Sequence, residues 1–189
     1  MLELEKSVQA INYLIKKLNK SHIDKLEVLK LIFLADRYHL RKYARTITND
    51  TYFAMTYGPV ASSVKDIAEL SDFLSETQKK YTLKYLDKAY EHQVKSIAEV
   101  DLDVFSKTDL EALDKAVELK NKCKSLVDFT HEFPEWKNHE GQISELRARV
   151  DMDLIDCFLE APPNIEYCPV DSEILELNKE HYESMKSLW

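Results

Sequence analysis

Residues 28–38 read Val-Leu-Lys-Leu-Ile-Phe-Leu-Ala-Asp-Arg-Tyr, and this stretch decides the fold. Seven of its first eight residues are apolar, which leaves a helix almost no polar face. A helix of that kind belongs at the buried centre of a domain. Asp24, a little upstream, is of a residue type that caps helix N-termini. We therefore predict a buried central helix that begins after Asp24 and ends at about Lys42.

The segments on either side of this helix predict a second helix and a short strand. Downstream, the polar loop 45–50 precedes residues 51–57, whose β-branched and aromatic side chains suit a strand. Gly58 should end that strand, and Pro59 fits the first turn of a further helix. That helix would carry Val60, Val64, Ile67 and Leu70. Upstream, apolar residues recur at helical intervals at Leu4, Val8, Ile11, Ile15 and Leu18.

The rest of the chain predicts short helices and few strands. Residues 81–86 and 93–97 alternate weakly, so two strands and irregular structure both stay open. The further expectations are helices after Ser106, Ser125 and Gly141, a connector with Pro134 and Trp136, and helices over 151–160 and 171–189. Glycine occurs only twice, which disfavours a sandwich or barrel. The predicted class is mainly α (α+β), a compact multi-helix domain with a buried central helix and a small antiparallel sheet or hairpin.

Length and composition predict one globular domain in a reducing compartment. The chain has 189 residues, 44% of them hydrophobic and 32% charged, and can bury a core without disulfides. The three cysteines, Cys123, Cys157 and Cys168, form no close pair, which fits free thiols. No stretch reads as a signal peptide or membrane span. We expect a soluble, cytoplasmic protein without a membrane partner.

The charge distribution favours a basic partner. The formal net charge is −8, with a balance of +4 over residues 1–50, −4 over 51–150 and −8 over 151–189. An acidic chain is a poor binder of phosphate backbones, which argues against nucleic acid. The basic residues between 16 and 45 are better explained as a solvated helix face. The acidic C-terminal end should attract a basic protein.

Patterns that would support catalysis are incomplete. His131-Glu132 lacks the second histidine one helical turn later that a zinc-protease helix requires. Cys123, His131 and His139 include no close pair to begin a zinc site. No glycine-rich loop can hold a phosphate. We expect no catalytic, cofactor-binding or metal-binding residues, and therefore no enzyme.

The last segment carries an apolar stripe on an acidic helix. Its stripe consists of Ile174, Leu175, His181, Tyr182, Met185 and Leu188. The pattern fits core packing and an amphipathic helix bound in a partner's groove equally well. The residues expected to contact a partner are Leu175, Tyr182, Met185, Leu188 and Trp189.

Several short motifs together resemble the Panacea, or SocA-like, antitoxin domain. They are the helix 31–38 with Asp36, Asp50 ahead of an aromatic-alanine strand, Tyr57-Gly58-Pro59-Val60, and later His131 and Trp136. Thr130 stands where the family often has serine. We expect these motif residues to have a structural role in the fold rather than a direct role in partner binding. The resemblance gives a domain over 1–161, followed by an acidic amphipathic segment over 162–189 that packs on the same domain or on a partner.

The resemblance implies a role rather than a reaction. Members of this family act as antitoxins of type II toxin–antitoxin pairs and neutralise toxins by direct binding. The expected partner is a small, basic protein toxin. Two alternatives follow from the same family: a proteolytic adaptor that delivers a bound protein to a cytoplasmic protease, and a phage- or plasmid-linked transcriptional regulator.

Overall fold

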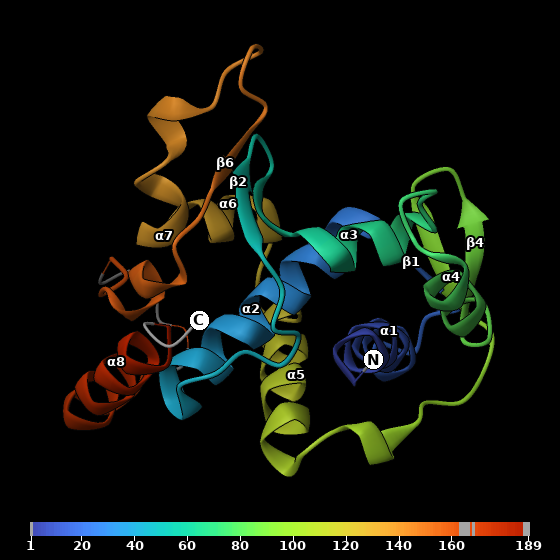
Figure 1. The fold of residues 1–189 in the computed structure, drawn as a ribbon, viewed down its shortest axis with the longest axis horizontal. Helices are drawn as coiled ribbons and strands as arrows, with labels where there is room; N and C mark the ends of the chain where they lie inside the picture. Colours follow the sequence, from blue (N-terminus) through green and yellow to red (C-terminus); the bar gives the residue numbers. More distant parts are fainter. Residues whose placement is uncertain (1, 163–166, 168, 187–189) are drawn as a thin grey trace.

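The computed structural model describes residues 2–162, 167 and 169–186, and helix α2 (Lys25–Tyr43) is its axis (Figure 1). Every residue of α2 from Val28 to Arg41 is buried. The Asp24 carboxylate accepts a hydrogen bond from the Leu26 backbone N–H at 2.8 Å and caps the helix. The predicted buried central helix and its cap are therefore confirmed.

The predicted class, mainly helical α+β, is also confirmed. The helical elements are α1 (Leu2–Lys17), α2, α3 (Ser62–Glu69), α4 (Glu76–Thr82), η1 (Leu102–Val104), α5 (Lys107–Lys120), α6 (Leu126–His131), α7 (Pro134–Lys137), η2 (Glu140–Gln142), η3 (Leu154–Phe158) and α8 (Ser172–Lys186). The strands are β1 (His22–Asp24), β2 (Tyr52–Met55), β3 (Gly58–Ala61), β4 (Leu86–Tyr90), β5 (Gln93–Ser96) and β6 (Arg149–Asp151). Among the described residues they form two antiparallel three-stranded sheets, ordered β1-β5-β4 and β3-β2-β6.

The β1-β5-β4 sheet lies at one end of the molecule, whereas the β3-β2-β6 sheet lies beside α2 (Figure 1). Helix α1 contacts α2, α3, α5 and the β1-β5-β4 sheet, and its apolar stripe is buried in the core. Helices α6 and α7 lie beside the β3-β2-β6 sheet, while α8 packs on α2 and η3 (Figure 1). No helix in the described part of the chain is long and apolar enough to span a bilayer.

The helix predicted to begin at Pro59 is wrong. Gly58–Ala61 is strand β3, paired with β2 so that Pro59 lies opposite Ala54, and α3 begins only at Ser62. The backbone φ of Gly58 is +96°, which reverses the chain directly into a hairpin. Proline has no N–H to donate, but β3 is an edge strand, where that loss is tolerated.

The two weakly alternating segments, 81–86 and 93–97, have different secondary structure. Of residues 81–86, for which a strand and irregular structure were both open, most belong to α4 and the turn after it, because Ser75 and Gln78 form a capping box that starts a helix. Strand β4 begins only at Leu86, whereas for residues 93–97 the strand is the alternative that the structure shows, as β5 over Gln93–Ser96.

Two other expectations near the C-terminal end are wrong, and a third is confirmed in part. Pro134 and Trp136 lie in helix α7, where Pro134 occupies the first turn. Gly141 lies in the 3₁₀ helix η2 and is followed by a turn and strand β6, where a helix was expected. Of the short helix expected over 151–160, residues 154–158 form the 3₁₀ helix η3, while Asp151 still belongs to β6. In β6 only Val150 is buried, so the sequence offers no periodic pattern to read.

Two motif carboxylates organise the loop between α2 and α3. Buried Asp36 accepts hydrogen bonds from the Ile47 N–H at 2.7 Å, from the Thr48 N–H and hydroxyl, and from the Tyr52 hydroxyl at 2.8 Å. Burial raises the pKa of Asp36 to about 6, although these donors act in the opposite direction. Asp50 accepts from the N–H groups of residues 63 and 64 at 3.1 and 2.9 Å, and so caps α3 from a distance.

Substituting the two glycines should separate their roles. A Cβ at Gly58 would lie 2.9 Å from the Thr130 hydroxyl oxygen and 3.0 Å from the Lys30 ammonium, and φ is already left-handed. Gly58→Ala should lower the free energy of unfolding by about 2–4 kcal/mol, from strain and overpacking. Gly141→Ala meets nothing within 4 Å and is the control, with a change within about 1 kcal/mol. Urea unfolding measures both, and equal midpoints would contradict this account.

Candidate functional site

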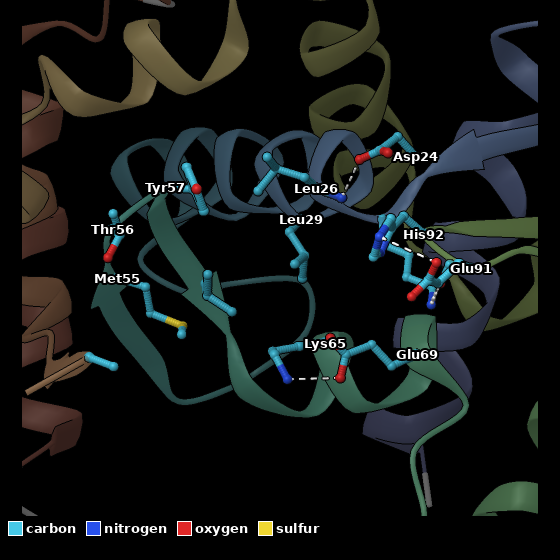
Figure 2. Close-up of a pocket in the computed structure, with 13 residues that line it drawn as sticks. Asp24, Leu26, Leu29, Met55, Thr56, Tyr57, Lys65, Glu69, Glu91 and His92 are labelled. Atoms are coloured by element: carbon cyan, nitrogen blue, oxygen red, sulfur yellow. Dashed lines mark hydrogen bonds and ion pairs between the residues drawn. The ribbon is translucent and has the colours of Figure 1, made fainter. Parts of the chain in front are cut away.

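A groove runs between α2, the β2–β3 hairpin, α3 and the β4–β5 turn (Figure 2). Its volume is about 770 Å³, within the range of protein binding sites. Its lining combines apolar and charged side chains: Leu26, Leu29, Met55, Tyr57, Val60 and Ala148 on the one hand, and Asp24, Lys25, Lys65, Glu69, Glu91 and His92 on the other. Thr56 completes it. Four separate segments therefore build this groove.

The hairpin wall of the groove is held at both sides of its turn. The Trp136 indole Nε1 donates to the Met55 carbonyl oxygen at 3.0 Å. The Lys30 Nζ donates to the Pro59 carbonyl oxygen at 2.7 Å. Between these anchors Tyr57 is 64% exposed at the tip of the hairpin. The backbone is thus fixed while an aromatic side chain stays accessible.

Lys30 is an unusual anchor because it is fully buried. Among the described residues, no carboxylate lies within ion-pair distance of its ammonium group. Desolvation lowers the pKa of Lys30 to about 7, since burial disfavours the charged form. The absence of a side chain at Gly58 leaves room for the lysine, whose Nζ would otherwise lie 3.0 Å from a Cβ.

The motif histidine supports the same anchor. The ring of His131 stacks on Trp136 with centroids 3.8 Å apart and an interplanar angle of 6°. Burial, followed by the charge of Lys30, lowers the pKa of His131. Its neighbour Thr130 is buried and donates to the Val127 carbonyl oxygen at 3.0 Å. His131 therefore packs the tryptophan that holds the hairpin.

The residues expected to contact a partner on α8 have different environments. Leu175 is buried in a small core with Leu40, Cys157 and Phe158. Tyr182 is partly buried, with its ring centroid 5.8 Å from that of Phe158. Met185 is 44% exposed. The two terminal residues of the expected set, Leu188 and Trp189, lie outside the described residues.

A second apolar stripe of α8 faces solvent. Ile174 is 47% exposed and Leu177 is 64% exposed. The helix itself is fixed by Leu175, by the Asn178 amide, which donates to the Arg41 carbonyl oxygen at 3.0 Å, and by a 2.7 Å ion pair between Lys186 and Asp153. The helix therefore both packs on the domain and exposes an apolar face.

The basic residues of the first third do not form a continuous positive surface. Most of them pair with carboxylates from other segments: Lys16 with Glu99, Lys17 with Asp114, Lys20 with Glu27, Lys42 with Glu111, and Arg45 with Asp109. Arg37 is buried against Glu135, with 2.5 Å between Nε and Oε1. A phosphate backbone would thus meet alternating charges.

Reactive groups elsewhere are enclosed or scattered. Burial raises the pKa of the Cys157 thiol well above its usual value, which keeps it protonated. Cys123 is partly buried and is also a free thiol, while Cys168 lies outside the described residues. No group of three or more His, Cys, Asp or Glu side chains within the described ranges is placed to hold a metal ion.

Lys30, which anchors the hairpin, is not among the site residues predicted from the sequence. The signal was present, because Lys30 is the single polar residue in the apolar run from 28 to 35. A lysine at that position needs an acceptor inside the core. The groove itself could not be read from the sequence, because its walls are far apart along the chain.

Comparison with known proteins places this architecture in a family. A family model described as "Antitoxin SocA-like, Panacea domain" matches residues 28–137. The match extends from the apolar run of α2 through the hairpin to α7, and it confirms the resemblance seen in the sequence motifs. The comparison with curated proteins found no match, and the comparison with solved structures found none either.

The pH dependence of stability should report on Lys30. Because its pKa falls from 10.5 to about 7 on folding, the unfolded chain binds more protons between these values, and stability should rise with pH there. Relative to Lys30→Met, the wild type should gain about 1 kcal/mol per pH unit between about pH 7 and 9. Urea unfolding at several pH values measures this. Lys88→Met, at an exposed position of β4, is the control, and parallel curves for wild type and Lys30→Met would refute the assignment.

Proposed function

From the premise that the chain belongs to the antitoxin SocA-like, Panacea domain family, we propose that it is an antitoxin that binds and neutralises a partner toxin. The observation that carries the proposal is the family match over residues 28–137. That range includes nearly all of α2, the hairpin, α3, the β4–β5 turn and Trp136, which together build and anchor the groove. Antitoxin action as part of a type II pair requires a stable surface for a protein partner.

The structure supports binding through preorganisation. The hairpin tip is held by Lys30 and Trp136, so a partner that contacts Tyr57 does not have to order the loop first. Avoiding such ordering increases affinity. Exposed aromatic side chains on rigid backbone are frequent centres of binding energy.

The charge of the chain supports a basic toxin as partner. The formal net charge is −8, and α8 adds Glu173, Glu176, Glu180 and Glu183 around its exposed apolar stripe. Complementary charge speeds association and selects against acidic proteins. We further propose that the protein acts in the cytoplasm, by occupancy and without catalysis or a cofactor.

Co-expression with the small gene adjacent to the coding sequence tests this function. Expression of that gene alone should stop growth, and co-expression should restore it and yield a complex that survives size-exclusion chromatography. A neighbour that is not toxic, or toxicity that co-expression leaves unchanged, would remove the basis of the proposal. Loss of the toxin over time in the rescued cells, in place of a stable complex, would instead identify a proteolytic adaptor.

The exposed stripe of α8 should contribute to neutralisation. Leu177→Asp places a charge on that stripe without touching the buried Leu175, so the thermal unfolding midpoint should stay within about 2 °C. If the toxin contacts α8, growth rescue should weaken at least about tenfold, because an unpaired carboxylate buried in an apolar interface costs more than about 1.4 kcal/mol. Leu102→Asp on η1 is the control, since Leu102 is 50% exposed. Unchanged rescue by Leu177→Asp would exclude α8 from the interface.

A further inference from the structure

The groove beside the hairpin has an apolar end and an acidic end. At the hairpin end, Met55 lies across from Leu29 of α2 (Figure 2), and Val60 of β3 also lines the groove. Asp24, Glu91 and His92 lie near one another at the opposite end (Figure 2). The two ends therefore present different chemistry to a single occupant.

The acidic end keeps uncompensated charge. Lys65 is paired with Glu69 at 2.8 Å, and the Lys25 ammonium donates to the backbone carbonyl of Glu91 at 2.8 Å. Within the described ranges, no lysine or arginine lies within ion-pair distance of the carboxylates of Asp24 and Glu91. The Glu91 side chain is 85% exposed, with His92 at 4.0 Å as its nearest ionisable partner.

The shape of the groove selects a polypeptide segment. Exposed side chains stand at both of its ends, Tyr57 at the hairpin and Glu91 at the far turn, so each end is accessible to a partner. An enclosed cavity suits a small molecule, whereas an open groove with an apolar floor suits side chains projecting from a longer chain. The volume of about 770 Å³ accommodates more than one such side chain.

We propose that this groove binds a segment of the partner protein in which a bulky apolar side chain is followed, within about one helical turn, by arginine or lysine. The apolar side chain lies on Leu26, Leu29, Met55 and Val60, where it leaves water. The basic side chain lies at Asp24 and Glu91, whose carboxylates lack a cationic partner in the described structure. Tyr57 closes over the apolar end. The inference deepens the proposed function, because the segment would belong to the toxin.

Synthetic peptides test the chemistry without knowledge of the toxin. Three capped peptides of equal length are compared on the full chain: one with leucine and arginine one turn apart, one with leucine and glutamate, and one with serine and arginine. Trp189→Phe leaves Trp136 as the single tryptophan, and its indole N–H signal in ¹H–¹⁵N NMR spectra reports on the hairpin through the bond to Met55.

The leucine–arginine peptide should bind at least about tenfold tighter than either of the others and should shift residues 55–57, residues 91–92 and the Trp136 indole. Glu91→Lys should remove the preference for arginine over glutamate, and its exposed position makes misfolding a poor explanation. Asp103→Lys, an exposed charge reversal on η1 outside the groove, should leave the preference intact. Equal binding of the three peptides, or shifts confined to other residues, would overturn the inference.

The failure of this inference and of the proposed function are distinguishable. If the toxin is neutralised equally well by wild type, Tyr57→Ala and Glu91→Lys, the antitoxin assignment stands and the groove is not its recognition site. If the peptide preference is found but no neighbouring protein is neutralised, the groove stands and the antitoxin assignment falls. Self-association that Glu91→Lys abolishes would assign the groove to a second copy of the chain and overturn the proposal.

Discussion

The hydrogen bond from the Lys30 ammonium to the Pro59 carbonyl oxygen is the interaction on which the rest of this architecture depends. It places a titratable group inside the central helix core, where desolvation opposes its charge. Gly58 leaves room for this bond, because a Cβ there would lie 3.0 Å from the Lys30 Nζ, and the residue adopts a left-handed φ. Lysine, glycine and hairpin therefore form one unit: the core helix fixes the turn, and the turn fixes the edge of the groove.

The other motif residues serve the same end from different directions. Asp36 attaches the loop after α2 to the helix, Asp50 caps α3, and Trp136 holds strand β2 of the hairpin. Each uses a polar side chain to satisfy backbone groups: those of the loop after α2, of the first turn of α3 and of strand β2. The consequence is that a motif which looks like a scattered set of structural residues determines where Tyr57 and the groove lie. Fold and binding surface are not separable in this region.

The sequence predicts those elements whose pattern is local. Helices α1 and α2 follow from apolar periodicity and from the Asp24 cap. The segment that forms strand β3 instead predicts a helix, because proline is compatible both with the first turn of a helix and with an edge strand. Strand β6 is defined by pairing with β2 across about a hundred residues, and no local signal marks it. The groove was equally inaccessible, because contacts between distant segments create it. Lys30 is the exception, since its polar character within an apolar run could have been recognised as a demand for an internal partner.

The groove beside the hairpin and the exposed face of α8 differ in whether they lie within the part of the chain that matches the family. The matched range contains most of the groove, while η3 and α8 follow after it ends. The groove residues and the exposed face of α8 have no residue in common, and the acidic groups beside each are separate. Energies of substitutions at surfaces without shared contacts add. A partner that touches both would therefore lose the sum of the two single effects in a double variant, whereas a partner that uses one surface would lose nothing from the second change. This additivity separates recognition common to the domain from recognition supplied by the C-terminal helix of this chain.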